Sequence, residues 1–167
     1  TGTFASATGD CSVGGTTVSN MQIGIRARDA GEKTHNFFPG NINNVVLWNS
    51  ALSAGNMLTI YNNGSPLITL AEQPSSGDVQ AWWKLDASAT YDGTDWTIPD
   101  DSTNSNDGTS VAMTTANLVT SDLSVTEAFE KYSLDFDAGD PDYISVPASS
   151  DFDFTSSDAM TVTAWVK

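Results

Sequence analysis

Short runs with an apolar residue at every second position are the feature that most constrains the fold of this chain. The runs are 21–25, 45–48, 80–86, 134–136, 144–146 and 160–166. Successive side chains of a β-strand point to opposite faces, so each run predicts a strand with at least one apolar face. Gly, Asn, Asp, Pro and Ser flank the runs. Short strands separated by such turn residues are typical of an antiparallel sandwich.

Composition favours the same class, because hydrophobic residues make up 39% of the 167 residues and charged residues only 16%. Thr, Ser, Asn and Gly replace the Lys and Glu that helical bundles need. One segment near 53–62 departs from the strand pattern. Ser53 can cap a short helix with Ala54, Met57, Leu58 and Tyr61 on one side, and residues 62–64 provide its stop.

The formal net charge of -15 is unevenly distributed. Residues 71–167 hold 18 of the 21 acids and 3 of the 6 bases, while residues 1–70 are balanced. Nucleic acid and an anionic membrane surface are therefore not expected as partners. No apolar run reaches the roughly 20 residues that span a bilayer, so membrane insertion is not expected either. The acids form either a solvated coat or, in part, a site for divalent cations.

The chain has one cysteine, Cys11, and one histidine, His35, which limits the catalytic and metal sites that it can form by itself. A lone cysteine forms no internal disulfide. A lone histidine also excludes sites built from several His or Cys ligands. We assign no catalytic residue from these types.

Two stretches resemble concanavalin A-like domains of the laminin-G-like and pentraxin-like kind. The first resembles the closing part of such a domain and comprises Phe38–Asn49, Ala51–Ser53 and Tyr61–Gly64. The second resembles the opening part and comprises Trp82–Asp86, Asp101–Asn104, Ser133–Asp137, Asp142–Val146 and Thr161–Lys167. The resemblance implies an all-β, antiparallel jelly-roll β-sandwich of the concanavalin A-like type.

In this chain the closing part precedes the opening part, which allows two interpretations. In the first, residues 1–64 are the C-terminal part of one module, 65–78 are a linker, and 79–167 are the N-terminal part of a second module. In the second, the whole chain is one circularly permuted sandwich, which neighbouring termini permit. We favour the tandem arrangement and expect neighbouring modules of the same kind as partners.

Members of this family often hold calcium at the rim of the sandwich, and two acidic loops are candidates here. They supply Asp101, Asn104 and Asp107 from one segment and Asp140 and Asp142 from the next. Calcium prefers six to eight oxygen ligands of this kind. The alternative is turn chemistry, because Asp and Asn side chains also bond to the nearby backbone.

Aromatic side chains are candidates for stacking on sugar rings, and most of them are expected in the core. Trp96 is the exception because it lies in a polar segment with Tyr91. We therefore take Trp96 and Tyr91 as candidate ligand-binding residues, with packing over a sheet edge as the alternative for Trp96.

Some concanavalin A-like proteins are glycosidases, which need two carboxylates facing one cleft. None of the four glutamates lies in an alternating pair, and Asp135 and Asp137 flank the apolar Phe136. The sequence favours a non-catalytic recognition or adhesion module that binds a glycan or a surface protein. The expected location is extracellular, on a cell surface or a virion surface. A purely structural repeat and a hydrolase fragment are the alternatives.

Overall fold

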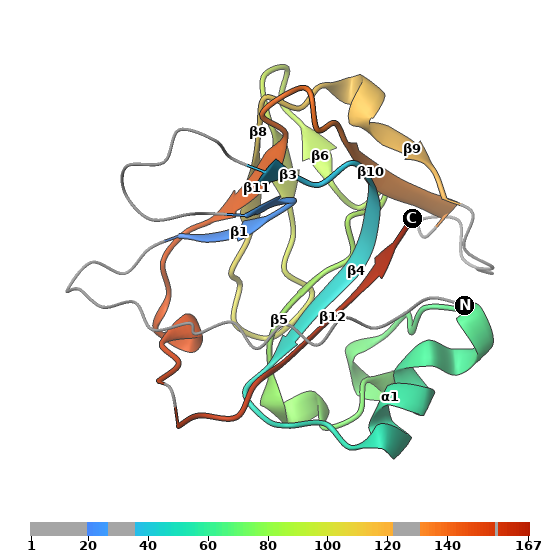
Figure 1. Ribbon diagram of the computed structural model, residues 1–167, viewed down its shortest axis with the longest axis vertical. Coiled ribbons are helices and arrows are strands. Elements are labelled where there is room, and N and C mark those ends of the chain that lie inside the picture. The colour runs from blue at the N-terminus through green and yellow to red at the C-terminus, as the bar shows by residue number, and fades with distance from the viewer. Residues whose placement is uncertain (1–19, 27–35, 122–130, 156) are drawn as a thin grey trace.

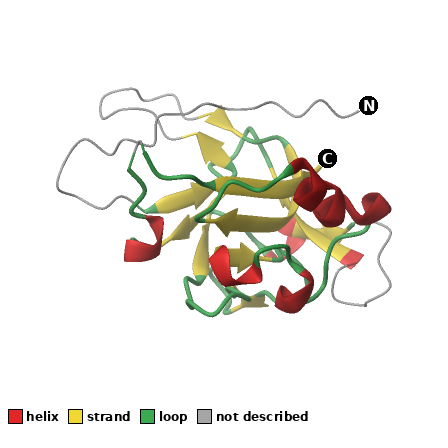
Figure 2. Cartoon of the chain, turned by 90° about the horizontal axis from the view of Figure 1, so that it is seen from below, coloured by secondary structure: helices red, strands yellow, loops and turns green. Residues whose placement is uncertain are grey.

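The computed structural model describes residues 20–26, 36–121, 131–155 and 157–167. Within them the chain is mostly β, with two antiparallel sheets and one short α-helix (Figure 1). In the view turned by 90°, strands occupy the middle of the molecule and helical turns lie around them (Figure 2). No described helix has the length and apolar character needed to cross a membrane.

The first sheet has the strand order β1-β11-β8-β7-β6. Its strands are β1 (Met21–Ile23), β6 (Thr90–Tyr91), β7 (Trp96–Ile98), β8 (Gly108–Val111) and β11 (Tyr143–Val146). A separate pair of short strands, β2 (Ile25–Arg26) and β3 (Asn36–Phe37), follows a bend at Gly24. Gly24 has a φ of 87° and packs directly under the Phe136 ring, where a Cβ would lie 2.4 Å from ring carbons.

The second sheet is built around β4 (Gly40–Trp48), the longest strand. β12 (Thr161–Val166) pairs along one edge of β4. The other edge takes β10 (Tyr132–Phe136) at its start and β5 (Val79–Trp83) at its end. β9 (Leu118–Thr120) then pairs with β10. Sequence-distant segments on both sides of residues 65–78 are therefore joined in one sheet.

A bulge at Asn44 divides β4 into these two pairing regions. Thr163 lies opposite Val46 and Trp165 opposite Asn43, so β4 holds one residue more than β12 between these pairs. Asn44 has a left-handed φ of 49°, which asparagine tolerates better than most residues. The extra residue lets Ile42 and Val45, three positions apart, both face the main core.

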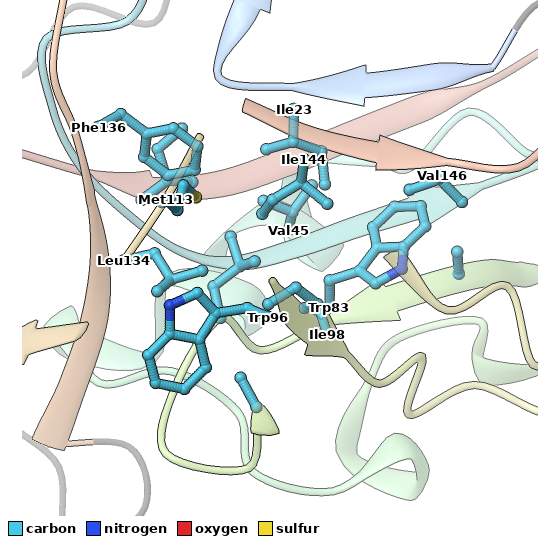
Figure 3. Packing of buried hydrophobic residues seen from close by; sticks show 14 residues of the cluster. Ile23, Val45, Trp83, Trp96, Ile98, Met113, Leu134, Phe136, Ile144 and Val146 are labelled. Carbon is cyan, nitrogen blue, oxygen red and sulfur yellow. The ribbon is translucent and has the colours of Figure 1, made fainter. Parts of the chain in front are cut away.

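Both sheets contribute to that main core (Figure 3). Its buried members are Ile23, Ile42, Val45, Ala81, Trp83, Leu85, Ala89, Trp96, Ile98, Met113, Leu134, Phe136, Ile144 and Val146. The alternation predicted for 80–86, 134–136 and 144–146 is confirmed, since Ala81, Trp83 and Leu85 all join this cluster.

A second cluster lies on the outer face of the second sheet, at the far end of β4. It contains Val46, Trp48, Ile60, Val79 and Trp82. The helix α1 (Ala54–Tyr61) and residues of the 65–78 connector cover it, with Leu52, Met57, Leu67 and Leu70 packed against it. The strand predicted for 45–48 therefore has two apolar faces, with Val45 in the main core and Val46 and Trp48 in this second cluster.

The connector itself is ordered around short 3-10 turns. They span Leu70–Glu72 and Ser76–Asp78, and others in the chain span Asn62–Gly64, Thr115–Asn117 and Ser150–Phe152. The indole N–H of Trp48 donates to the Pro74 carbonyl at 3.0 Å. Residues 65–78 form no strand, as their prolines predict, and they pack against the sheet.

The ends of α1 are those predicted, but its buried face is not. Ser53 caps the helix by accepting from the Asn56 N–H, and Asn62 ends it with a φ of 39°. Ile60 is the buried residue, whereas Leu58 is 72% exposed and Tyr61 53% exposed. The helix docks by Met57 and Ile60 onto the second cluster, so the predicted side with Ala54, Leu58 and Tyr61 is wrong.

The burial expected for Val162 is also wrong. Val162 is 48% exposed and Val166 61% exposed, although both lie on the core-facing side of β12. Among the described strands β12 lies at the edge of its sheet, and an apolar groove separates its core-facing side from residues 21–25 and 37–39.

Candidate functional site

A pocket of about 240 Å³ lies on the outer face of the second sheet, next to the β4 bulge. It is lined by Asn41, Asn43, Thr120, Ser121, Ser133, Trp165, Val166 and Lys167. These residues come from β4, β9, β10 and β12, or directly follow them. The pocket thus lies on the sheet built around β4, the strand that pairs with β5, β10 and β12.

Strand alternation explains why polar groups line this pocket. Ile42 and Leu134 point into the main core, so the residues beside them point outward. Those residues are Asn41 and Asn43 on β4 and Ser133 on β10. Trp165 lies directly opposite Asn43, which brings its ring to the same face.

Hydrogen bonds hold the amides of the pocket in place. The Asn43 side-chain amide donates to the Tyr132 carbonyl at 2.7 Å, and its oxygen accepts from the Asn44 amide. The Asn41 amide donates to the Ser133 hydroxyl at 3.2 Å. In this bond the Ser133 oxygen acts as the acceptor, and the Ser133 side chain is only 2% exposed at the pocket.

Trp165 differs from the other four tryptophans of the chain. The indole N–H groups of Trp48, Trp82, Trp83 and Trp96 each donate to an oxygen of the chain at 2.8–3.0 Å. Among the residues that the structure describes, Trp165 has no such acceptor. Its ring stacks on the exposed Tyr61, with centroids 6.1 Å apart and an angle of 21° between the planes.

The chemistry of this lining is amphipathic. It combines an indole, two amides and several hydroxyls with one lysine, and no carboxylate, histidine or cysteine is among its described residues. Apolar faces with a few placed polar groups are typical of small-ligand pockets. A sugar ring, with apolar C–H faces and a rim of hydroxyls, matches this combination.

The structure places the predicted ligand-binding pair Trp96 and Tyr91 elsewhere, in the first sheet. The two rings contact each other at 5.2 Å, and Trp96 donates its indole N–H to the Thr114 carbonyl. Trp96 is only 6% exposed and belongs to the main core, which matches the packing alternative. Tyr91 is half-buried against the same core, so a ligand at this position would contact Tyr91 and not the buried Trp96.

The predicted metal ligands Asp101, Asn104 and Asp107 lie in the loop between β7 and β8. Asp101 approaches the Lys84 ammonium at 3.5 Å, and burial raises the pKa of its carboxyl. Asn104 donates to the Gln80 carbonyl, and Asp107 accepts from the Asp100 N–H. Only the Asp107 bond is local turn chemistry, because Gln80 lies in β5 and Lys84 directly follows it.

Asp100 is the residue that organises this loop. Its two carboxylate oxygens accept from the backbone of Trp82, Ser102 and Asn106 and from the Ser102 hydroxyl, all at 2.8–2.9 Å. The loop is thereby tied to β5 of the second sheet.

Asp140 and Asp142 lie in the loop between β10 and β11, at the other end of the first sheet. Asp140 is exposed, whereas Asp142 is buried and accepts from the Asn117 amide at 2.9 Å. Burial raises the pKa of the Asp142 carboxyl, although bonds from the Asp137 N–H and Asn117 oppose that effect.

The register of β8 and β11 keeps the two acidic loops apart. Tyr143, just after Asp142, pairs with Val111 at the end of β8, whereas Asp107 directly precedes the start of β8. Four strand residues span about 13 Å, and calcium binds oxygens at about 2.3–2.6 Å. One ion with ligands from both loops does not fit, and no described group of three acidic, His or Cys side chains forms a metal site.

Trp165 and its neighbours were missed as site residues because their strands were expected to bury large side chains. The signal in the sequence was the polar alternation Asn41-Ile42-Asn43 beside the aromatic position of 161–167. Cys11 and His35 lie outside the described residues.

Comparison of the chain with protein families, with curated proteins and with solved structures finds no match.

Proposed function

We propose that this chain is a non-catalytic recognition module that binds a glycan in the outer-face pocket. The proposal includes the finer fold expected from the sequence, a concanavalin A-like jelly roll. It rests on residue resemblance and on the pairing of β4 with β5, β10 and β12, which joins the closing and opening motifs in one sheet.

The observation that carries the proposal is the stacked aromatic pair of Trp165 and Tyr61, in which Trp165 lines the pocket together with Asn41 and Ser133. Tryptophan N–H groups normally find a partner when buried. Trp165 lines the pocket, and its N–H has no acceptor among the described residues, so a sugar hydroxyl can accept it. The half-buried Asn41 side chain supplies a further polar contact on the same face.

Binding is favoured over hydrolysis by the placement of the carboxylates. Asp135 lies opposite Asn41 on the outer face of β10, but none of the described residues that line the pocket is a carboxylate. Glycoside hydrolysis needs a pair of them, about 5–5.5 Å apart for retention and about 6.5–9.5 Å for inversion. Recognition requires no such pair.

The test is a glycan array followed by titration calorimetry on wild type and two variants. Trp165→Ala is expected to weaken binding of any glycan found by about tenfold or more, equivalent to about 1.4 kcal/mol. Tyr91→Ala, which alters the other aromatic pair, is expected to bind like wild type. Loss of binding in Tyr91→Ala with retention in Trp165→Ala would refute the pocket assignment, as would absence of any glycan ligand.

Calcium and an extracellular, cell-surface or virion location complete the proposal. A single ion would have to be held by one acidic loop, and the 100–107 loop offers more side-chain oxygens than its neighbour. A thermal shift with calcium that is reversed by chelator supports such an ion. A flat response would remove calcium from the proposal and leave glycan binding untouched, because the described pocket lining holds no carboxylate to bind a metal.

A structural role in a repeating assembly is the second candidate. It is favoured by the exposure of Val162 and Val166 on β12, which pairs with β4 alone among the strands that the structure describes.

A further inference from the structure

Lys84 is held beside an aromatic ring and a carboxyl group, directly after the end of β5. Its ammonium lies 4.8 Å from the centre of the Trp82 ring and 3.5 Å from Oδ2 of Asp101. The Lys84 side chain is only 20% exposed. Attraction between a cation and an aromatic face strengthens as water is excluded. The Lys84 amine is therefore positioned next to one particular carboxyl group.

Backbone pairing fixes the relative position of these two side chains. Trp83 and Asp100 form an antiparallel bridge. The Asp101 N–H donates to the Trp82 carbonyl at 2.8 Å, so Asp101 lies opposite Trp82. Lys84 is two residues beyond Trp82 and shares its face of the strand, and diagonal neighbours of this kind are within reach of a long side chain. The contact thus joins β5 of the second sheet to the segment after β7 of the first sheet.

The carboxyl group of Asp101 is incompletely bonded. Its Oδ2 is buried and has no hydrogen-bond partner among the described residues. The 3.5 Å to Lys84 Nζ exceeds the about 2.7–3.2 Å of an ordinary N–H···O bond. Burial raises the pKa of this carboxyl, an effect that Lys84 opposes and that Asp86 and Asp100 reinforce. Burial thus favours the neutral acid, which is the form that an amine can attack.

Asp86 supplies a second carboxyl group that water does not reach. Its side chain is 0% exposed, and one of its oxygens accepts from the Ser88 N–H at 2.8 Å. The other oxygen, Oδ2, has no hydrogen-bond partner among the residues that the structure describes. Asp86 lies close enough to Asp101 for its charge to act on that carboxyl. A buried oxygen without a partner is uncommon, and this one is free to accept a proton.

We propose that Lys84 and Asp101 form an intramolecular isopeptide bond, with Asp86 relaying a proton. The Lys84 ammonium first gives one proton to the Asp101 carboxylate, which leaves a neutral amine and a neutral acid. The Nζ lone pair then attacks Cγ of Asp101, the carbon that carries Oδ2. Asp86 takes a second proton from Nζ and passes it to the departing hydroxyl. The C–O bond breaks with its electron pair on oxygen, and one water leaves.

This reaction needs nothing beyond the chain itself. An ammonium and a carboxylate together contain the atoms and the charge of one amide and one water, and Asp86 ends in the form in which it began. The new bond closes a loop over residues 84–101 and restricts the unfolded chain, as other cross-links do. It is independent of glycan binding, because none of the three residues lines the pocket.

Intact-mass spectrometry of the denatured protein tests the bond directly. Wild type is expected to be lighter than its sequence by one water, whereas Lys84→Arg, which keeps the cation, is expected to have its full mass. Asp101→Asn is expected to reach the same final mass as wild type, because asparagine forms the same amide by releasing ammonia. Lys131→Arg, the same change at an exposed lysine, is the matched control and is expected to retain the loss of water.

Trypsin provides a second readout, since it does not cut after a lysine whose amine is acylated. Denatured wild type is expected to stay uncut after Lys84. Asp86→Asn, which lacks the relaying carboxylate, is expected to be cut there and to have its full mass. A full-mass wild type would overturn the proposal. So would a loss of water that persists in Lys84→Arg, or cross-linking in Asp86→Asn as complete as in wild type.

Discussion

Asn44 is the residue at which a single substitution should reveal how β4 is held. It combines a left-handed backbone with two buried side-chain bonds. Its amide donates to the Asn43 oxygen, and its own oxygen accepts from the Trp82 indole N–H at 3.0 Å. Trp82 is 1% exposed, so water does not replace this acceptor when it is removed.

The cost of Asn44→Ala follows from these two features. An unpaired buried N–H on Trp82 costs about 1–3 kcal/mol. A left-handed backbone costs a residue with a Cβ about 1–2 kcal/mol, and alanine lacks the local bonding that helps asparagine adopt it. The expected loss of unfolding free energy is therefore about 2–5 kcal/mol.

A double-mutant cycle with Trp82→Phe separates the two terms. Phenylalanine has no N–H to leave unpaired, so Asn44→Ala in that background should retain only the backbone part of its cost. The expected coupling is about 1–3 kcal/mol. Urea unfolding followed by far-ultraviolet circular dichroism measures it without relying on the removed tryptophan. Costs that add to within about 0.5 kcal/mol would refute the bond as a stabilising link between β4 and β5.

Three further substitutions test other parts of the structure. Gly40→Ala should lower the melting temperature by about 5–10 °C, because Gly40 has a φ of 139° and a Cβ would lie 2.1 Å from the Lys167 carbonyl oxygen; an unchanged melting curve would contradict that contact. Ser53→Ala should cost about 1 kcal/mol in urea unfolding through loss of the α1 cap, whereas Ser53→Asn should cost little. Asp142→Asn should be more stable than wild type at neutral pH, because burial raises the folded pKa of Asp142 and the charged form therefore opposes folding. That advantage should shrink as pH falls through the folded pKa and vanish below the unfolded value of 3.8. An advantage that instead grows on acidification would mean that folding lowers the pKa of Asp142.

Much of the fold could be predicted from the sequence because local alternation determines which face of a strand is apolar. Leu134, Phe136, Ile144 and Val146 are buried as that pattern indicates. The position of α1 was predictable from the Ser53 cap and the Asn62 stop. Its buried face was not, because the cluster that α1 covers is formed by strands distant in sequence.

The candidate site was less predictable, since exposure depends on a strand's neighbours as much as on its own residues. Trp96 lies in a polar segment but packs into the core through the β7–β8 hairpin. Trp165 lies in an apolar strand but faces outward, because the Asn44 bulge and the register with β4 place it opposite Asn43. Likewise, the separation of the two acidic loops follows from the β8–β11 pairing, which no local motif encodes.

The most direct test of glycan recognition is the set of five indole N–H signals in a two-dimensional NMR spectrum. Four of these groups donate hydrogen bonds within the chain, whereas Trp165 lines the pocket and its N–H has no acceptor among the described residues. Titration with a glycan selected by array should shift the Trp165 signal strongly and slow its exchange with water, with the other four nearly unchanged. A bound glycan that leaves the Trp165 signal in place, or that shifts Trp96 instead, would contradict the proposed site.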